Sequence, residues 1–286
     1  MAQTLDLCSY QGLLRRFLAE DIGAGDLTSE AVVTPSQVAV GCFIAKAPLV
    51  LAGLEIALEV IRLLDSDLDA EMRHHDGDFL EPGDEPAIVR GKARALLSGE
   101  RVALNLLQRL SGIATLTRKY VEAIKGTKAE ILDTRKTTPG LRAFEKYAVA
   151  VGGGSNHRLN LNDAILIKEN HIHLAGGVRQ AIACAQAAGK NARFVEVEVT
   201  SLEELEEALV EKPDVILLDN MTPESVEKAV VMARQRSDKV LLEASGGITL
   251  ENVRQYAEAG VDWISIGALT HSAPAADLSL EIEPAL

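Results

Sequence analysis

The sequence predicts an α/β protein in which a (β/α) barrel follows an N-terminal α+β domain. From about residue 130, short β-branched runs alternate with helical patterns, and parallel strands need such crossover helices. One run, FVEVEV at 194–199, places Glu196 and Glu198 on one face and valines on the other. A barrel would turn these carboxylates inward, whereas a doubly wound sheet has apolar helices on both faces.

The barrel strands are expected at 130–133, 164–168, 194–199, 215–219, 240–244 and 263–267. Helix start signals lie between them, such as a Ser or Thr cap with Pro or Glu in the first turn at 200–204 and 222–225. A closed TIM barrel has eight units. The count of six therefore leaves two alternatives, an incomplete barrel or one irregular unit.

Residues 1–112 lack this rhythm and predict a separate domain. Its expected elements are helices at 10–20 and 53–64, strands at 38–45 and 87–96, and a long helical pattern from 98 to about 125. Gly112 lies inside the long pattern, where it is expected to bend the helix or link the domains. The barrel, with the active site, is then assigned to 113–274. Alternation at 277–283 suggests that 275–286 complete the first domain's sheet.

Composition excludes several partner classes. The chain has 286 residues with 42 acidic and 29 basic side chains, so its net charge of −13 argues against nucleic acid or an anionic membrane as partner. No apolar run approaches the roughly 20 residues of a membrane span, and no secretory pattern precedes the first helix, so a cytoplasmic location is expected. Three cysteines without metal-ligand spacing predict buried reduced thiols.

Barrel enzymes carry their reactive groups at the carboxyl ends of the strands, which makes the residues ending each run site candidates. A glycine-rich loop at 152–158 adds two more. The candidates are Arg135, Lys136, His157, Arg158, Lys168, Glu198, Asp219, Ser245, Gly246 and Gly267.

Cations are concentrated between residues 135 and 168, a local exception in an acidic chain. Arginine suits bidentate binding of carboxylate and lysine suits phosphate, so a ligand with both groups is indicated. The alternative is that these cations form structural salt bridges with Glu196, Glu198 and Asp219, although buried ion pairs contribute little stability.

Two further sites have competing interpretations. Glycines after the last two strands fit the phosphate site of barrels, yet tight turns would also need them. Glu198 and Asp219 could share Mg²⁺, act as acid or base, or pair with Lys168. His74 and His75 are expected in a solvated turn, whereas His171 or His173 is expected to support the site.

The motifs together resemble quinolinate phosphoribosyltransferase, and they do so in order along nearly the whole chain. In the barrel they are TRKTTPGLR (134–142), KY (146–147), GGGSNHR (152–158), IKENH (167–171), EVE (196–198), LDN (218–220) and EASG (243–246). In the first domain they are EDIGAGDLTS (20–29), SGERVALN (98–105) and LSGIAT (110–115). Asn160 departs from the glycine associated with the family two residues after the His-Arg pair.

The resemblance implies an incomplete (β/α) barrel with an N-terminal α+β sandwich domain. It also implies a reaction in which quinolinate and phosphoribosyl pyrophosphate give nicotinate mononucleotide, pyrophosphate and CO₂, with Mg²⁺. Arg135, His157 and Arg158 would hold the quinolinate carboxylates. Lys136 and Lys168 would lie near the pyrophosphate, with Lys136, Lys168, Glu198 and Asp219 as the catalytic set.

By the same resemblance, Glu198 and Asp219 would organise Mg²⁺ and the ribose, while Ser245, Gly246 and Gly267 would take the 5′-phosphate. Arg101 would reach the neighbouring subunit's site, so a homodimer would be the minimum active unit. Three rivals remain at this point: a related transferase with another acid acceptor, a Schiff-base lyase using Lys168, and a non-catalytic anion-binding protein.

Overall fold

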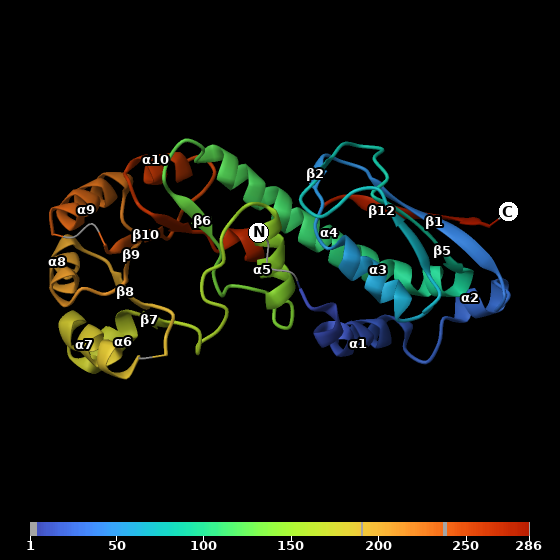
Figure 1. Ribbon diagram of the computed structural model, residues 1–286, viewed down its shortest axis with the longest axis horizontal. Coiled ribbons are helices and arrows are strands. Elements are labelled where there is room, and N and C mark those ends of the chain that lie inside the picture. Colours follow the sequence, from blue (N-terminus) through green and yellow to red (C-terminus); the bar gives the residue numbers. More distant parts are fainter. Residues whose placement is uncertain (1–4, 190, 237–238, 286) are drawn as a thin grey trace. The chain divides into compact units, whose positions relative to one another are not determined.

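The computed structural model describes residues 5–189, 191–236 and 239–285, which form two compact units (Figure 1). The first unit contains the described chain up to Arg118, Phe144–Gly153, and the residues from Ala273 onward. The second contains Lys119–Ala143 and Gly154–Ser272. The segment Phe144–Gly153 therefore groups with the first unit, whereas the sequence interpretation places it inside a domain running from 113 to 274.

The first unit is built on an antiparallel sheet with the strand order β12-β1-β5-β3. β12 runs antiparallel to β1 with Ala39 opposite Pro284 and Ala45 opposite Leu278, so the chain end returns to the first sheet. A second, two-stranded pair joins β2 to β4. The strands are β1 (Val38–Ala45), β2 (Leu49–Val50), β3 (Asp69–Met72), β4 (Phe79–Leu80), β5 (Ala87–Lys92) and β12 (Leu278–Pro284).

Helices accompany this sheet, and their ends follow local signals. Asp26 caps α2 by accepting the Ser29 N–H at 2.9 Å, and its carboxylate also accepts the Ser98 hydroxyl. The first family motif is therefore partly structural. The elements are η1 (Leu7–Tyr10), α1 (Gln11–Ile22), α2 (Leu27–Val32), α3 (Leu54–Arg62), α4 (Ala93–Ala123) and α5 (Arg142–Val151).

The boundaries of α4 correct one expectation, and its packing explains Gly112. It begins directly after β5, so the strand expected at 87–96 ends at Lys92, and it continues without a break through Gly112. A Cβ added at Gly112 would lie 2.0 Å from the carbonyl oxygen of Pro274. The glycine is therefore required for close packing of the chain at 274–275 against the helix, a role that the sequence did not indicate.

The described part of the second unit forms a parallel sheet of six strands in the order β6-β11-β10-β9-β8-β7. The strands are β6 (Glu130–Leu132), β7 (Ile165–Ile167), β8 (Val195–Val199), β9 (Val215–Asp219), β10 (Leu241–Ser245) and β11 (Trp263–Ser265). They match the six predicted runs. Within the described ranges no ladder joins β6 to β7, so the barrel is incomplete as the family resemblance implies.

Helices follow these strands along the chain, and the ones labelled in Figure 1 lie outside the strands. They are α6 (Glu169–Ala175), α7 (Val178–Ala188), α8 (Leu202–Glu211), α9 (Pro223–Arg236), α10 (Val253–Glu258) and α11 (Ala268–His271). The alternation in β8 works as predicted: its valines are buried, and its glutamates face the interior groups described below.

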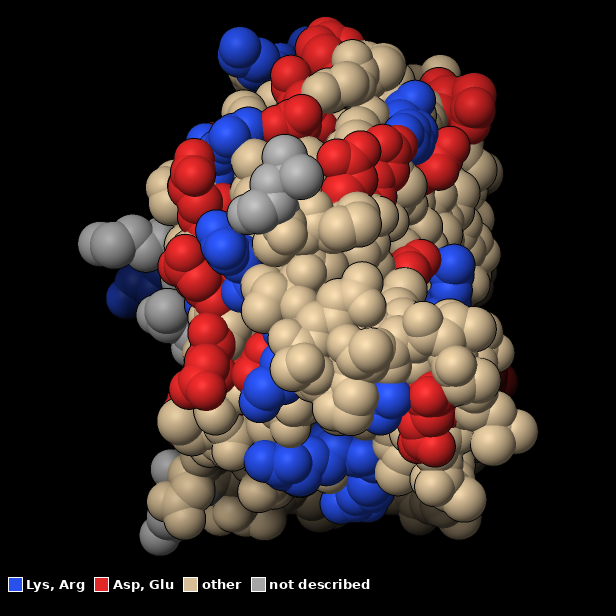
Figure 2. Space-filling view, turned by 90° about the vertical axis from the view of Figure 1, so that its right-hand side faces the viewer, with Lys and Arg blue, Asp and Glu red and all other residues tan. Residues whose placement is uncertain are grey.

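Surface features refine the composition argument. All three cysteines are free, but Cys8 and Cys184 are exposed, so the prediction of buried thiols is wrong for these two. Among the described residues, no helix combines the length and apolarity needed to cross a bilayer. Figure 2 shows acidic and basic side chains interspersed over one face, with a group of Lys and Arg along its lower edge, so the net charge does not describe every patch.

Candidate active site

A cavity of about 260 Å³ opens where the strands of the second unit end. Every strand of the sheet supplies a wall residue at or just beyond its carboxyl end, as expected for a barrel enzyme. The lining residues are Asp133, Thr134, Arg135, Lys136, His157, Arg158, Leu166, Lys168, Glu198, Leu217, Asp219, Glu243, Ser245 and Ser265.

The structure brings together most of the predicted site residues. All of them line this cavity except Gly246, Gly267 and Arg101. The two glycines adjoin lining residues, since Gly246 directly follows Ser245 and a Cβ at Gly267 would lie 2.9 Å from Lys136 Cδ. Arg101 lies on α4 in the first unit, where its side chain is 58% exposed and its ion-pair partner is Glu100 at 3.9 Å.

Three cations of the cavity form what we call the anion pocket: Arg135, Lys136 and Arg158. Within the described part of the chain none of the three makes an ion pair. Arg158 is only 5% exposed, and its Nη1 donates to the Ala164 carbonyl at 3.0 Å. Burial, and after it the charge of Arg135, lowers the pKa of this guanidinium.

The salt-bridge alternative therefore fails for the anion pocket. Arg158 is buried, Arg135 is half-buried and Lys136 is exposed. A buried cation without a counter-ion is costly, so the retention of Arg158 beside two further cations indicates an anionic ligand. The alternative holds for one cation of the cavity, Lys168, whose Nζ lies 2.9 Å from Glu198 Oε2.

Asp133 ties the loop that carries His157 and Arg158 to the end of β6. This fully buried carboxylate accepts the His157 N–H at 2.9 Å with one oxygen and the Asn156 amide at 2.7 Å with the other. Asp133 also donates its own N–H to the Ser155 carbonyl. One side chain thus sets the distance between two consecutive parts of the site.

The lysines are positioned by backbone contacts. Thr270 donates its hydroxyl to the Lys136 carbonyl at 2.8 Å, and a Cβ at Gly267 would lie 2.9 Å from Lys136 Cδ, so the glycine makes room for the lysine stem. At the start of α6, the Lys168 N–H donates to His171 Nδ1 at 2.9 Å. This contact gives His171 the supporting position expected from the sequence.

Glu198 and Asp219 face the cavity from neighbouring strands. Burial, followed by the charge of Glu198, raises the pKa of Asp219, while the Asn220 amide opposes this shift by donating to Asp219 Oδ2 at 2.6 Å. Two hard carboxylate oxygens beside an anion pocket fit a Mg²⁺ site, because Mg²⁺ takes one or two carboxylates together with substrate phosphates.

A turn after β10 adjoins this acidic pair. Gly246 has φ +96°, and a Cβ there would lie 2.2 Å from Asn220 Oδ1. Asn220 is itself left-handed, with φ 54°, and its N–H donates to the Ser245 carbonyl at 2.9 Å. Asn220 therefore links the end of β9 to the turn after β10 at a position where side chains larger than glycine rarely adopt this backbone.

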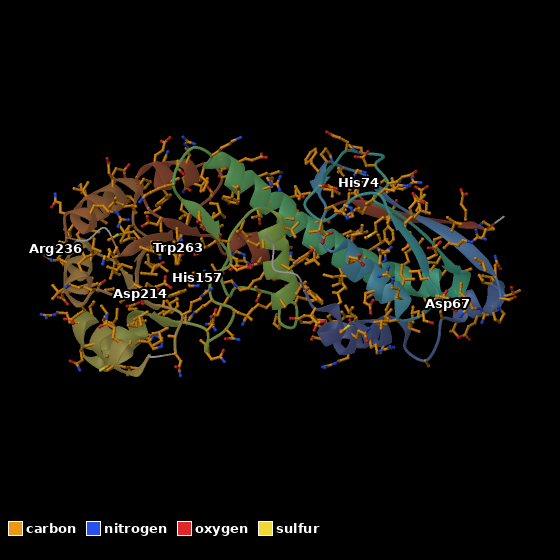
Figure 3. The ribbon with its side chains drawn as sticks, in the orientation of Figure 1. Asp67, His74, His157, Asp214, Arg236 and Trp263 are labelled. Atoms are coloured by element: carbon orange, nitrogen blue, oxygen red, sulfur yellow. The ribbon has the colours of Figure 1, made fainter. Side chains whose placement is uncertain are left out.

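A buried group adjoins Arg158 and consists of His157, Glu196 and Glu243. We call it the triad. Nε2 of the imidazole lies 3.0 Å from Glu196 Oε2 and 3.4 Å from Glu243 Oε2. The ring packs edge-on against Phe194 and Trp263, and Figure 3 shows His157 and Trp263 in the same part of the second unit.

The protonation states of the three triad residues depend on one another. Burial, and after it the charge of Glu243, raises the pKa of Glu196 to about 7. Burial opposes the charged form of His157, but its contacts with Glu196 and Glu243 outweigh this and raise the imidazole pKa to about 9. Nδ1, however, accepts the Arg158 N–H at 2.8 Å, which a doubly protonated ring cannot do. This contact therefore favours a ring with its hydrogen on Nε2 alone, and it opposes the second proton that the raised pKa favours.

Several functional residues were missed by the sequence interpretation. They are Asp133, Asn220, Glu243, Ser265 and Thr270. Glu243 and Asn220 lie inside quoted motifs, and Asp133 directly precedes one, so the strand-end rule could have found them. Ser265 Oγ lines the cavity, is buried, and has no hydrogen-bond partner among the described residues.

Known protein families and relatives match this chain over most of its length. The model of the quinolinate phosphoribosyl transferase C-terminal domain matches residues 113–281, and that of the N-terminal domain matches 26–111. A nicotinate-nucleotide pyrophosphorylase [carboxylating] of Mycobacterium leprae is 46% identical over 275 residues, covering 94% of this chain and 95% of that protein.

Two other relatives agree. A probable nicotinate-nucleotide pyrophosphorylase [carboxylating] of Bacillus subtilis is 45% identical over 270 residues, with 94% and 92% of the two chains covered. The crystal structure of NadC from Streptococcus pyogenes superposes with a TM-score of 0.94 at 41% identity, over 99% of this chain and 100% of that one. Similarity of sequence and of fold therefore extends over both units.

Proposed function

Because the chain belongs to the quinolinate phosphoribosyl transferase family, we propose that it transfers phosphoribosyl from phosphoribosyl pyrophosphate to quinolinate with loss of CO₂. The products are nicotinate mononucleotide, pyrophosphate and CO₂, in de novo NAD biosynthesis. The relatives that support this proposal carry the word carboxylating in their names.

One structural observation carries the proposal: the anion pocket is a set of cations without ion-pair partners in the described chain. A dicarboxylate and a pyrophosphate are the groups such a set binds, since arginine forks match carboxylates and lysine binds phosphate. We assign Arg135 and Arg158 to the quinolinate carboxylates, and Lys136 with Lys168 to the pyrophosphate and reacting centre.

The glycine turns are assigned to the 5′-phosphate. A Cβ at Gly247 would meet no atom within 4 Å, so open space lies beside the turn that starts at Ser245 and Gly246. Backbone N–H groups at such a turn can bind phosphate oxygens. Gly267 completes this subsite by bringing the chain after β11 against Lys136.

We propose that the enzyme uses Mg²⁺ held by Glu198 and Asp219, either directly or through water and substrate oxygens. The bound ion would supply charge neutralisation for the departing pyrophosphate. Lys168, paired with Glu198 at 2.9 Å, fixes one of these carboxylates in the absence of substrate.

The chain's own residues then perform two tasks. They bring two anions together that would otherwise repel each other, and they stabilise positive charge that develops on the ribose as pyrophosphate leaves. Glu198 and Asp219 face this charge. Decarboxylation at the ring carbon next to nitrogen follows more easily once the ring nitrogen has become a pyridinium.

A homodimer with shared sites is part of the proposal. Arg101 is exposed in the first unit and would contribute to the partner's anion pocket. Arg101→Ala subunits mixed with Lys168→Ala subunits should regain activity through hybrid sites. Absence of recovery after confirmed subunit exchange would count against sharing. We assign the enzyme to the cytoplasm, with no nucleic acid or membrane partner.

The decisive experiment follows CO₂ release from carboxyl-labelled quinolinate with and without phosphoribosyl pyrophosphate and Mg²⁺. Release that requires both supports the proposal. A folded sample that binds phosphoribosyl pyrophosphate yet releases no CO₂ would indicate a transferase with a different acid acceptor. Borohydride trapping of a substrate on Lys168 would indicate a Schiff-base lyase instead.

A further inference from the structure

The triad is a buried polar group that the proposed reaction leaves without a role. Glu196 is fully buried and Glu243 is 1% exposed, yet both carboxylates converge on a single imidazole nitrogen. Burying two carboxylates is costly, so their contact with His157 must offset that cost or serve the site.

Both ring nitrogens of His157 are engaged by the protein. Nε2 faces the two carboxylates, and Nδ1 accepts the N–H of Arg158, the next residue in the chain. His157 therefore cannot use a ring nitrogen for a substrate carboxylate without giving up one of these contacts. The imidazole therefore holds the backbone N–H of Arg158 in place.

This orientation reaches the anion pocket through Arg158. The peptide group before His157 is held by Asp133, which accepts the His157 N–H at 2.9 Å. The peptide group after it is held by the imidazole itself. The Arg158 guanidinium is then anchored at its far end by the Ala164 carbonyl. The arginine is thus fixed at both ends, with the triad behind it.

A metal ion is the competing explanation for the triad, because its ligand atoms lie within 4.8 Å of one another. Metal binding at Nε2 would require the hydrogen to move to Nδ1. Nδ1 already accepts an N–H, so that tautomer would set two hydrogens against each other. The hydrogen-bond pattern therefore favours Nε2–H facing the carboxylates.

We propose that Glu196 and Glu243 are positioning residues that act through His157: they orient the imidazole, the imidazole orients the backbone at Arg158, and the guanidinium is thereby presented to a substrate carboxylate. This inference rests on the proposed function and assigns His157 a supporting role in quinolinate binding in place of direct contact.

The test measures quinolinate binding by isothermal titration calorimetry. At pH 8, where the Glu196 carboxyl is ionised, Glu196→Gln keeps the shape of the side chain but removes its charge, and it should weaken quinolinate binding by about tenfold to a hundredfold. Glu243→Gln should act in the same direction and serves as the second variant if the first fails to fold. The matched control is Glu207→Gln on the exposed face of α8, which should bind quinolinate as the wild type does.

A pair of His157 variants separates the two steps. In His157→Asn, the side-chain oxygen takes the place of Nδ1, whereas in His157→Gln the amide reaches the position of Nε2. Since the carboxylates act through the ring, adding Glu196→Gln to His157→Asn should change affinity less than twofold. A full additional loss in the double variant would show that Glu196 acts independently and would overturn the proposal.

Nitrogen NMR of histidine-labelled wild-type protein provides a readout that does not depend on binding. Absence of the His157 signals from His157→Asn assigns them, and the expected pattern is one protonated nitrogen, Nε2. A ring protonated on Nδ1, or a stoichiometric metal found by elemental analysis that chelation removes, would overturn the inference. Wild-type protein that binds no quinolinate would overturn the proposed function, whereas equal binding by wild type and Glu196→Gln would overturn only this inference.

Discussion

Two arginines show how differently the two units use buried charge. In the first unit, Arg109 donates to Glu145 Oε1 from Nη2 at 2.9 Å and from Nε at 3.1 Å, and its Nη1 donates to the Ala273 carbonyl. In the second unit, Arg158 is more deeply buried, yet among the residues that the structure describes its guanidinium donates to one carbonyl and forms no ion pair with a carboxylate. The first contact is complete within the protein, whereas the second leaves most of a guanidinium for something else.

The difference separates structural charge from functional charge. A buried pair whose partners satisfy each other stabilises a fold only modestly, but removing one partner is strongly destabilising. A buried cation that lacks a counter-ion costs stability in the empty protein and gains it from an anionic ligand. Stability and activity should therefore respond in opposite ways to substitutions at the two arginine sites.

The largest effect is expected for Arg158→Ala. This change should lower kcat/KM for quinolinate by about a thousandfold or more, or ~4 kcal/mol, because a bidentate carboxylate contact in a buried pocket is lost. The free energy of unfolding should be unchanged or higher, since an uncompensated buried charge is removed. Steady-state kinetics and urea unfolding check both statements, and an active variant would contradict the assigned role.

The converse change is Glu145→Ala, which should lower the free energy of unfolding by about 4 kcal/mol because it strips Arg109 of its carboxylate. The double variant Arg109→Met with Glu145→Met should recover much of this loss, since both charges of this pair are then replaced by apolar side chains. Urea unfolding of the three proteins measures the difference. A single variant as stable as the wild type would show that the pair is not structural.

The sequence predicted the six parallel strands because β-branched runs and helix caps are local signals. It also predicted the inward Glu196 and Glu198, because side chains alternate along a strand. It did not predict why Gly112 is a glycine, since the reason is its contact with a chain segment about 160 residues later. The same holds for Asn220 and Asp133, whose roles depend on contacts between different strand ends.

The pKa of Glu196 gives a pH-dependent test of how a buried charge in the triad affects stability. Glu196 has its pKa raised to about 7, so the folded protein binds a proton that the unfolded chain releases near pH 4.5. Stability from this group is present below pH 4.5 and is lost as pH rises to 7. Glu196→Gln mimics the protonated form, so it should be more stable than wild type by about 3 kcal/mol at pH 8.

Urea unfolding at several pH values measures this difference. The advantage of Glu196→Gln should shrink to nearly zero below about pH 3.5, where the wild-type carboxyl is protonated in both the folded and the unfolded state. Glu207→Gln, an exposed substitution on α8, controls for the general effect of removing one negative charge. A constant difference across the range would show that Glu196 is not protonated in the folded protein.

The smallest effect is expected for Asn220→Gly, which keeps the left-handed backbone but removes the amide that donates to Asp219. We expect kcat to fall about tenfold, or ~1.4 kcal/mol, because a carboxylate facing the reacting ribose loses its fixed orientation. Lys212→Gly is the matched control, since Lys212 has the same φ of 54° at the end of α8, away from the cavity lining. If both variants changed kcat equally, relief of backbone strain would explain the result. A loss of kcat confined to Asn220→Gly would mean that the acidic residues beside the anion pocket depend on a partner that positions them. Arg158 depends on the triad in the same way.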